Sequence, residues 1–125
     1  MSSMLPTVIY NQETGNVKLV VGASGGSTII STAASVIVRT LLLNESLKDA
    51  IDRPRLHNQW LPHVTEYEGG LPGALLSALS GRGQKLDKPR FIGSSQAVLR
   101  PRDDAATLHA VSDRRRPSTS RPAGY

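Results

Sequence analysis

The residues best suited to chemistry form a glycine-rich run, Gly22-Ala23-Ser24-Gly25-Gly26, between an apolar β-branched run and a helix-forming segment. Side chains do not shield the backbone N–H groups of such a turn, and the following helix adds unpaired N–H groups and the positive end of its dipole. The run therefore predicts a place where negative charge is stabilised, as a bound anion or as an oxyanion in a transition state. The competing interpretation is a tight turn that lets strand and helix pack closely.

Three functional interpretations of this run stay open. The first is a nucleophile elbow, because the run satisfies G-x-S-x-G and is followed by Asp103 and His109 in the required order. That fold needs a wide parallel sheet, whereas the preceding strand is predicted to pair in a hairpin. The second is a phosphate loop, although the Walker lysine and the dinucleotide spacing are absent. The third is an oxyanion hole that serves a nucleophile located elsewhere.

The other polar candidates favour structural roles. Cysteine is absent, which excludes disulfides, thiolate catalysis and cysteine-based zinc sites. His57, His63 and His109 lack ligand spacing, so neither a metal nor another cofactor is predicted. Arg53 and Arg55 flank a proline and are expected to pair with carboxylates or to bind backbone carbonyls.

A group of arginines near the end of the sequence suggests a nucleic-acid binder as an alternative class of protein. The group comprises Arg114, Arg115, Arg116 and Arg121. Such guanidinium groups can hold phosphates without sequence preference. No aromatic platform accompanies them and the first 99 residues carry a net charge of only +2, which disfavours nucleic acid as a partner.

Short strands and helices must position these candidates. In chain order, the predicted elements are strands at 7–10 and 17–21, helices at 27–43 and from 44 or 45 to 53, a strand at 63–68, a helix at 72–81, and strands at 94–99 and 107–111. The glycine run is expected to end the second strand, and Asn44 to cap the second helix. This order predicts an α+β layered protein with a largely antiparallel sheet.

Apolar periodicity predicts which faces of the first two helices point inward. The residues concerned are Ile30, Ala34, Ile37, Val38 and Leu41 in the first helix, and Leu47, Ala50 and Ile51 in the second. They recur at spacings of three and four, as expected for one face of a helix.

Length and composition limit the class of protein. The 125 residues suffice for one domain, and 38% hydrophobic with 4% aromatic residues predict a modest core. Residues 113–125 are rich in Arg, Pro and Ser, which is typical of a disordered tail. We recognise no signal peptide, and the longest apolar stretch, 28–43, is too short to span a bilayer, so no direct membrane insertion is expected.

Four motifs follow one another along the chain. They are Ser2-Ser3-Met4-Leu5-Pro6-Thr7, the run from Leu19 to Gly26 that opens a helix, Pro54 to Gln59, and Ala123-Gly124-Tyr125. Together they resemble the C-terminal part of the small subunit of gamma-glutamyltransferase, also called glutathione hydrolase. Val111 to Arg115 also resembles the closing segment of that family, which argues against a disordered tail there.

The resemblance implies a fold and a site. The fold is part of an N-terminal-nucleophile hydrolase αββα sandwich with mostly antiparallel sheets, so that 1–125 form a single partial domain and 114–125 its Arg/Pro/Ser-rich end. By resemblance, Ser2 and Ser3 match the pair that binds the α-carboxylate of the glutamyl group. Gly25 and Gly26 match the glycines whose N–H groups hold the oxyanion. Glutathione or another gamma-glutamyl compound is the implied substrate.

The sequence departs from the family at the nucleophile. The family's catalytic Thr lies upstream of the serine pair, and Thr7, Thr28 and Thr32 fall inside predicted elements. We therefore expect no gamma-glutamyl transfer by the isolated chain, because acyl transfer needs a nucleophile and its base. The implied partner is the large subunit or the N-terminal part of the small subunit. A non-catalytic, light-chain-like partner or regulator of a full-length gamma-glutamyltransferase is the alternative. The family implies an extracellular, cell-surface or periplasmic location.

Overall fold

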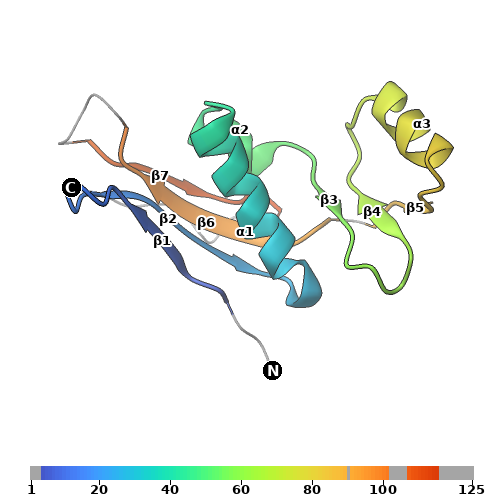
Figure 1. The fold of residues 1–125 in the computed structure, drawn as a ribbon, viewed down its shortest axis with the longest axis horizontal. Helices are drawn as coiled ribbons and strands as arrows, with labels where there is room; N and C mark the ends of the chain where they lie inside the picture. Colours follow the sequence, from blue (N-terminus) through green and yellow to red (C-terminus); the bar gives the residue numbers. More distant parts are fainter. Residues whose placement is uncertain (1–3, 90, 102–106, 116–125) are drawn as a thin grey trace.

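A four-stranded antiparallel sheet with helices on one face forms the larger part of the protein (Figure 1). The computed structural model describes residues 4–89, 91–101 and 107–115. The strand order is β1-β2-β6-β7, with β1 at Thr7–Tyr10, β2 at Val17–Ser24, β6 at Ser94–Leu99 and β7 at His109–Ser112. Helices α1 (Ile29–Ile37) and α2 (Leu47–Asp52) cover one face of this sheet.

A smaller second sheet lies beside the first. It comprises β3 (Leu56–His57), β4 (Thr65–Tyr67) and β5 (Leu86–Asp87) in the order β3-β4-β5. Its β4–β5 pair is parallel, and α3 (Gly73–Gly81) forms the connection between these two strands. The prediction of an α+β fold with largely antiparallel sheets is confirmed, although β3 and β5 were not predicted.

The main core lies between the large sheet and the helices. Its fully buried members are Leu19, Val21, Val36, Leu47, Ile51 and Ala97. The predicted inward face of α2 is confirmed, because Leu47, Ala50 and Ile51 are all buried. Among the described residues no helix covers the opposite face of the sheet, where Val8, Val20 and Val98 lie side by side across three adjacent strands. These three valines are 36–55% exposed, so that face is both apolar and open.

The predicted end of the second strand was wrong. Strand β2 continues through Gly22 to Ser24, because residues 19–24 pair without interruption with Leu99 to Ser94 of β6. A glycine weakens a strand locally, but pairing with β6 keeps this segment extended, and the Ala23 amide also donates to the Met4 carbonyl on the other side.

The predicted helix over 27–43 is divided into three segments. A 3₁₀ turn, η1 (Gly26–Thr28), leads into α1, which passes into a π-helical segment, η2 (Val38–Leu42). The predicted inward face of this helix was only partly correct, because Ile37 and Leu41 pack against the core but Ile30, Ala34 and Val38 are exposed. The buried residues are Ile29, Thr32, Ala33, Val36 and Thr40, whereas Ile30 and Val38 are 69% and 42% exposed. Apolar residues surround most of this helix, and packing on the sheet selects a face about one residue away from the predicted one.

The predicted cap of the second helix was wrong as well. Ser46 is the N-cap of α2 and its Oγ accepts a hydrogen bond from the Asp49 amide at 3.1 Å. Asn44 lies two residues earlier with φ +53°, a left-handed conformation that asparagine tolerates better than most residues.

Part of the predicted disordered tail is ordered. Asp113 is only 4% exposed, and Asp113 to Arg115 pack against α2 and the loop after it. The rest of the predicted tail, 116–125, lies outside the described residues, as does the Asp103-Asp104 pair.

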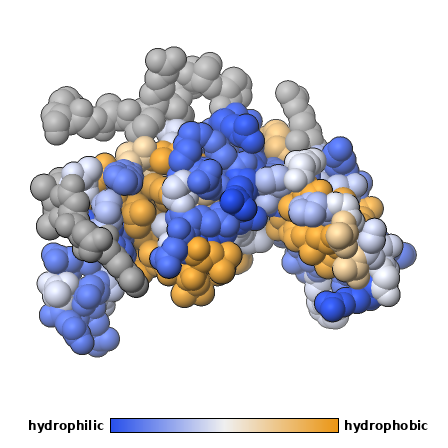
Figure 2. Space-filling model, turned by 90° about the horizontal axis from the view of Figure 1, so that it is seen from above, coloured by the Kyte–Doolittle hydropathy of each residue, from blue (hydrophilic) through white to orange (hydrophobic). Residues whose placement is uncertain are grey.

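Apolar surface is visible in the middle of the molecule and at the end that carries α3 (Figure 2). No residue of α3 is buried, so its three leucines, Leu75, Leu76 and Leu79, are at least partly exposed. Among the described residues, no helix has the length and apolar character needed to cross a membrane.

Candidate functional site

The glycine bend at the end of β2 has two backbone N–H groups for which the described residues provide no acceptor. Gly25 has φ +143° and Gly26 has φ +63°, both conformations that residues with a side chain rarely adopt. In the part of the chain that the structure describes, nothing accepts a hydrogen bond from either amide. Both residues are exposed, and the 3₁₀ turn at the start of the helix follows immediately. The bend therefore offers unpaired donors at a helix start, as an anion or oxyanion requires.

A second glycine packs closely against this bend. A Cβ built on Gly25 would lie 2.8 Å from the Cα of Gly93 and 2.6 Å from Thr28 Oγ1. A Cβ built on Gly93 would lie 2.3 Å from Thr32 Oγ1. By contrast, no atom lies within 4 Å of a Cβ built on Gly26. Gly25 is thus required by packing, whereas Gly26 faces open space in which a ligand atom could approach the backbone.

Thr28 holds the bend in shape. Its amide and its Oγ1 both donate to the carbonyl of Gly25, at 3.3 and 3.0 Å. The Oγ of Ser31, one turn further on, lies 3.1 Å from the Thr28 carbonyl and 2.7 Å from His57 Nδ1. The other ring nitrogen of His57 lies 3.1 Å from Gln59 Oε1. A continuous series of hydrogen bonds therefore joins the buried His57 to the glycine bend.

A buried network of two arginines and two carboxylates supports the bend from the other side. Arg55 is 1% exposed and donates to Asp113 Oδ2 at 2.8 Å. Arg115 forms a two-point contact with Glu68, through Nε to Oε1 at 2.7 Å and Nη2 to Oε2 at 2.5 Å. The predicted roles of Arg55 and Arg53 are confirmed, since Arg53 pairs with Glu45.

At Glu68, Asp113 and Arg115 hydrogen bonds and neighbouring charges outweigh the effect of burial on the pKa, whereas burial prevails at Arg55. Burial alone would raise the pKa of Glu68, but hydrogen bonds from Arg115 and from two backbone amides hold it below its ordinary value. Burial would likewise raise the pKa of Asp113, and the Arg115 amide and Arg55 lower it. Burial would lower the pKa of Arg115, whereas Glu68 and Asp113 raise it. Burial lowers the pKa of Arg55 against the opposing effect of Asp113.

The network fixes the segment that carries Gly93. Arg55 Nη1 donates to the carbonyls of Ile92 and Gly93 at 3.0 and 3.4 Å, and the Ile92 amide donates to Glu68 at 2.7 Å. Gly93 in turn contacts Gly25, so the buried charges position one wall of the bend. The sequence carries no signal for this, because the partners lie up to 58 residues apart.

The predicted serine pair cannot be placed, because Ser2 and Ser3 lie outside the described residues. The next residue, Met4, accepts a hydrogen bond from the amide of Ala23 at 3.2 Å. The chain that leaves the serine pair therefore runs beside the end of β2, two residues before the bend.

The structure does not support the nucleophile-elbow interpretation. Strand β2 pairs antiparallel with both of its neighbours, whereas an elbow needs a parallel sheet. His109 pairs with Leu99, and Ser24 pairs with Ser94 at the other end of β6. Asp103 lies outside the described residues.

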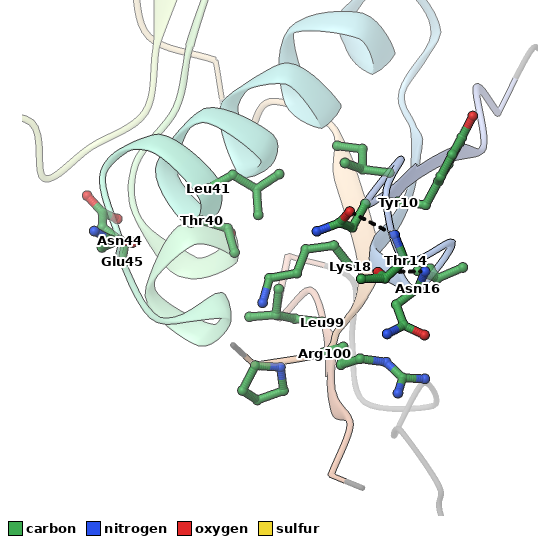
Figure 3. A pocket seen from close by; sticks show the side chains of 14 residues that line it. Tyr10, Thr14, Asn16, Lys18, Thr40, Leu41, Asn44, Glu45, Leu99 and Arg100 are labelled. Atoms are coloured by element: carbon green, nitrogen blue, oxygen red, sulfur yellow. Dashed lines mark hydrogen bonds between the residues drawn. The ribbon is translucent and has the colours of Figure 1, made fainter. Parts of the chain in front are cut away.

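One cavity lies away from the bend, at the hairpin end of the large sheet (Figure 3). It measures about 680 Å³, and Thr40 and Leu41 of η2 face Lys18 and Leu99 of the sheet across it. Thr40 is 6% exposed, and its hydroxyl has no partner among the described residues. A smaller cavity of about 180 Å³ lies beside the bend and is lined by residues that include Ser27, His57, Glu66 and Asp87.

The described residues give little support to a metal-binding or a nucleic-acid-binding role. No group of three His, Asp or Glu side chains in ranges 4–89, 91–101 and 107–115 could hold a metal ion. His63 stacks edge-on against Trp60 with ring centroids 6.4 Å apart. Of the arginine group, Arg115 is bound by Glu68 and Asp113 rather than displayed on the surface, and Arg114 lies 3.8 Å from Asp52. Arg116 and Arg121 lie outside the described residues.

The fold is an α+β layer whose large sheet is antiparallel, and the glycine bend at the start of a helix leaves two backbone amides without an acceptor among the described residues. The family model described as gamma-glutamyltranspeptidase matches residues 1–123, and the chain belongs to this family. It is similar to Scoloptoxin SSD20 of Scolopendra dehaani, with 41% identity over 92% of this chain and 57% of that protein. It is 34% identical to the glutathione hydrolase proenzyme of Escherichia coli K12, over 92% of this chain and 19% of that protein.

Solved structures of gamma-glutamyltranspeptidases also match this chain. A crystal structure of a Helicobacter pylori gamma-glutamyltranspeptidase mutant superimposes with a TM-score of 0.84 at 31% identity. The match covers 93% of this chain and 62% of that one. The present chain therefore spans less than two thirds of the length of these relatives.

Proposed function

We propose that this chain supplies the oxyanion-binding glycines and the glutamyl-carboxylate clamp of a site that cleaves the gamma-glutamyl bond of glutathione or a related compound. The observation that carries the proposal is the pair of unpaired amides at Gly25 and Gly26, in a bend that begins a helix. Gly26 faces open space, so that an oxygen of a tetrahedral intermediate can approach its N–H group.

The clamp would lie next to the bend. Ser2 and Ser3 supply hydroxyl donors that suit the α-carboxylate of a glutamyl group. The hydrogen bond between Met4 and Ala23 supports this assignment, because it keeps the chain after Ser3 beside the bend. In this arrangement the serines bind the substrate, and the glycine amides stabilise the charge that develops on the attacked carbonyl.

The chain would act as the C-terminal part of a small subunit. Its open sheet face, with the row Val8, Val20 and Val98, fits a second sheet packed on it, as in the αββα sandwich. We infer that the partner is the N-terminal part of the small subunit together with a large subunit. These 125 residues alone are expected to transfer no gamma-glutamyl group, because no Thr in them matches the nucleophile of the family.

Complementation tests this proposal. The chain is assayed with a gamma-glutamyl anilide, alone and after co-expression with the large subunit and the N-terminal small-subunit segment of the Escherichia coli relative. We expect release only in the complemented sample, and a higher KM for the anilide after Ser2→Ala/Ser3→Ala. Gly22→Ala is the matched control, because no atom lies within 4 Å of the added methyl group. Release by the isolated chain, or by the complemented serine variant with unchanged KM, would contradict the proposal.

The open apolar sheet face also favours a second candidate, a non-catalytic partner or regulator of a full-length gamma-glutamyltransferase. Here the chain would bind the large subunit without using its own bend. Co-purification that leaves anilide release independent of Ser2 and Ser3 would support this role, whereas dependence on the serines supports the catalytic one.

A further inference from the structure

His57 is buried and makes a hydrogen bond through each ring nitrogen. It is 7% exposed, and its Nε2 lies 3.1 Å from Gln59 Oε1. The amide nitrogen of Gln59 donates to the carbonyl of Leu61 at 2.9 Å, which identifies the oxygen as the atom facing the ring. Because a carbonyl oxygen only accepts, Nε2 of His57 carries a proton. The ring is therefore neutral when its other nitrogen, Nδ1, has no proton and positively charged when Nδ1 is protonated.

The hydroxyl of Ser31 has one hydrogen and two acceptors. Its Oγ lies 2.7 Å from His57 Nδ1 and 3.1 Å from the carbonyl of Thr28. When the ring is neutral, Nδ1 is an acceptor and the hydroxyl donates to it. When Nδ1 is protonated, the ring donates to Ser31, and the hydroxyl is free to donate to Thr28 instead. Protonation of His57 therefore reverses the direction of the hydrogen bond at Ser31.

Thr28, whose carbonyl accepts the hydrogen bond from Ser31, is also the residue that binds the glycine bend. Thr28 binds the carbonyl of Gly25 through both its amide and its Oγ1. A hydrogen bond accepted by the Thr28 carbonyl polarises that residue and the turn that contains it, since hydrogen bonds in series influence one another. The amide of Gly26 lies inside this turn.

We propose that His57 is a positioning residue for the glycine bend, acting through Ser31 and Thr28. This inference rests on the geometry of the hydrogen bonds. Its consequence for catalysis rests on the proposed function. The charged groups that face the ring are Glu66, its cross-strand neighbour on β4, and Asp87 on β5, which line the same small cavity. Helix α1 presents the uncharged Ser31 to the ring.

The test is a pH series of ¹H–¹⁵N spectra of the full 125-residue chain between about pH 5 and 8, where histidine changes charge. We expect the Gly26 amide signal to move with the same midpoint as the Cε1 proton of His57. In Ser31→Ala, the Gly26 signal should no longer follow that of the His57 Cε1 proton. Ser35→Ala, one turn further along the same helix, is the matched control and should leave the coupling intact.

Two results would overturn the proposal. One is a Gly26 signal that does not move in the unmodified chain while His57 titrates. The other is a Gly26 signal that follows His57 unchanged in Ser31→Ala. His57→Gln provides a second measurement, because it should remove the pH dependence of the Gly26 signal.

The spectra separate this inference from the proposed function, because they need neither substrate nor turnover. Coupling without serine-dependent anilide release in the complemented enzyme would refute the function and leave the role of His57 standing. Serine-dependent release with an uncoupled Gly26 would refute the role of His57 alone.

Discussion

Replacement of Gly25 by Ala should destabilise the protein much more than the same change at Gly26 or Gly22. The added methyl group at Gly25 would lie 2.8 Å from the Cα of Gly93, where carbon atoms normally stay about 3.5–4.0 Å apart. It would also force an alanine to φ +143°, outside the regions that L-residues populate. Both obstacles are backbone atoms or backbone angles, so side-chain rotation cannot relieve them.

The magnitude follows from these two effects. Strain at a forbidden backbone angle costs about 1–3 kcal/mol, and the shift needed to admit the methyl group costs about 1–3 kcal/mol more. Gly25→Ala should therefore lower the free energy of unfolding by about 2–6 kcal/mol. Gly26→Ala meets no atom within 4 Å and loses only about 1–2 kcal/mol for its left-handed φ. Gly22→Ala meets neither obstacle and should stay within about 0.5 kcal/mol.

Urea unfolding followed by circular dichroism measures this series. With a urea dependence of about 2 kcal/mol per M, the unfolding midpoint should fall by about 1–3 M for Gly25→Ala and by less than about 1 M for Gly26→Ala. Equal losses at Gly25 and Gly26 would show that the contact with Gly93 does not constrain the bend. A loss at Gly22 as large as that at Gly25 would refute the reasoning altogether.

Three further predictions concern the interior. Arg115→Ala should lower the free energy of unfolding by about 3–5 kcal/mol, because it leaves the buried carboxylates without their partner. The control is Arg114→Ala at an exposed side chain, which should change the free energy of unfolding by less than about 0.5 kcal/mol. Similar urea midpoints for the two variants would contradict this prediction. The lowered pKa values of Glu68 and Asp113 mean that the unfolded chain binds more protons than the folded one. Stability should therefore be complete above about pH 5 and should fall as the pH drops through about 4. Urea unfolding at pH 6, 4 and 3 measures this, and a constant midpoint would refute it. Thr40→Val keeps the shape of the side chain but removes a buried hydroxyl that has no hydrogen-bond partner among the described residues. The change should be neutral or should stabilise the protein by about 1 kcal/mol. A lower thermal midpoint would mean that the hydroxyl does make a hydrogen bond.

Local signals located several elements correctly. Strand β6 occupies the predicted residues 94–99, and α2 buries its predicted face. In both segments the apolar spacing is unambiguous and turn-forming residues mark the ends. The glycine run was recognised as a bend at a helix start for the same reason. The assignment of its glycines and of Ser2 and Ser3 to substrate binding stays a prediction.

Ambiguous patterns led to the errors. In α1, adjacent apolar residues such as Ile29 and Ile30 allow two overlapping faces, and only contact with the sheet selects the one with Ile29 buried. Strands β3 and β5 have two residues each, which is too short for any period to appear. Strand β2 continues through Gly22 because β6 pairs with it as far as Ser24.

The sequence by itself determined the family, the order of most elements and the position of the glycine bend, because these depend on residues close together in the chain. Only the tertiary structure decided what surrounds the bend. Gly93 lies against Gly25, His57 reaches Ser31 across 26 residues, and Arg55 meets Asp113 across 58. These contacts depend on how the sheet and helices pack, and chain-local propensities carry no information about partners so distant in sequence.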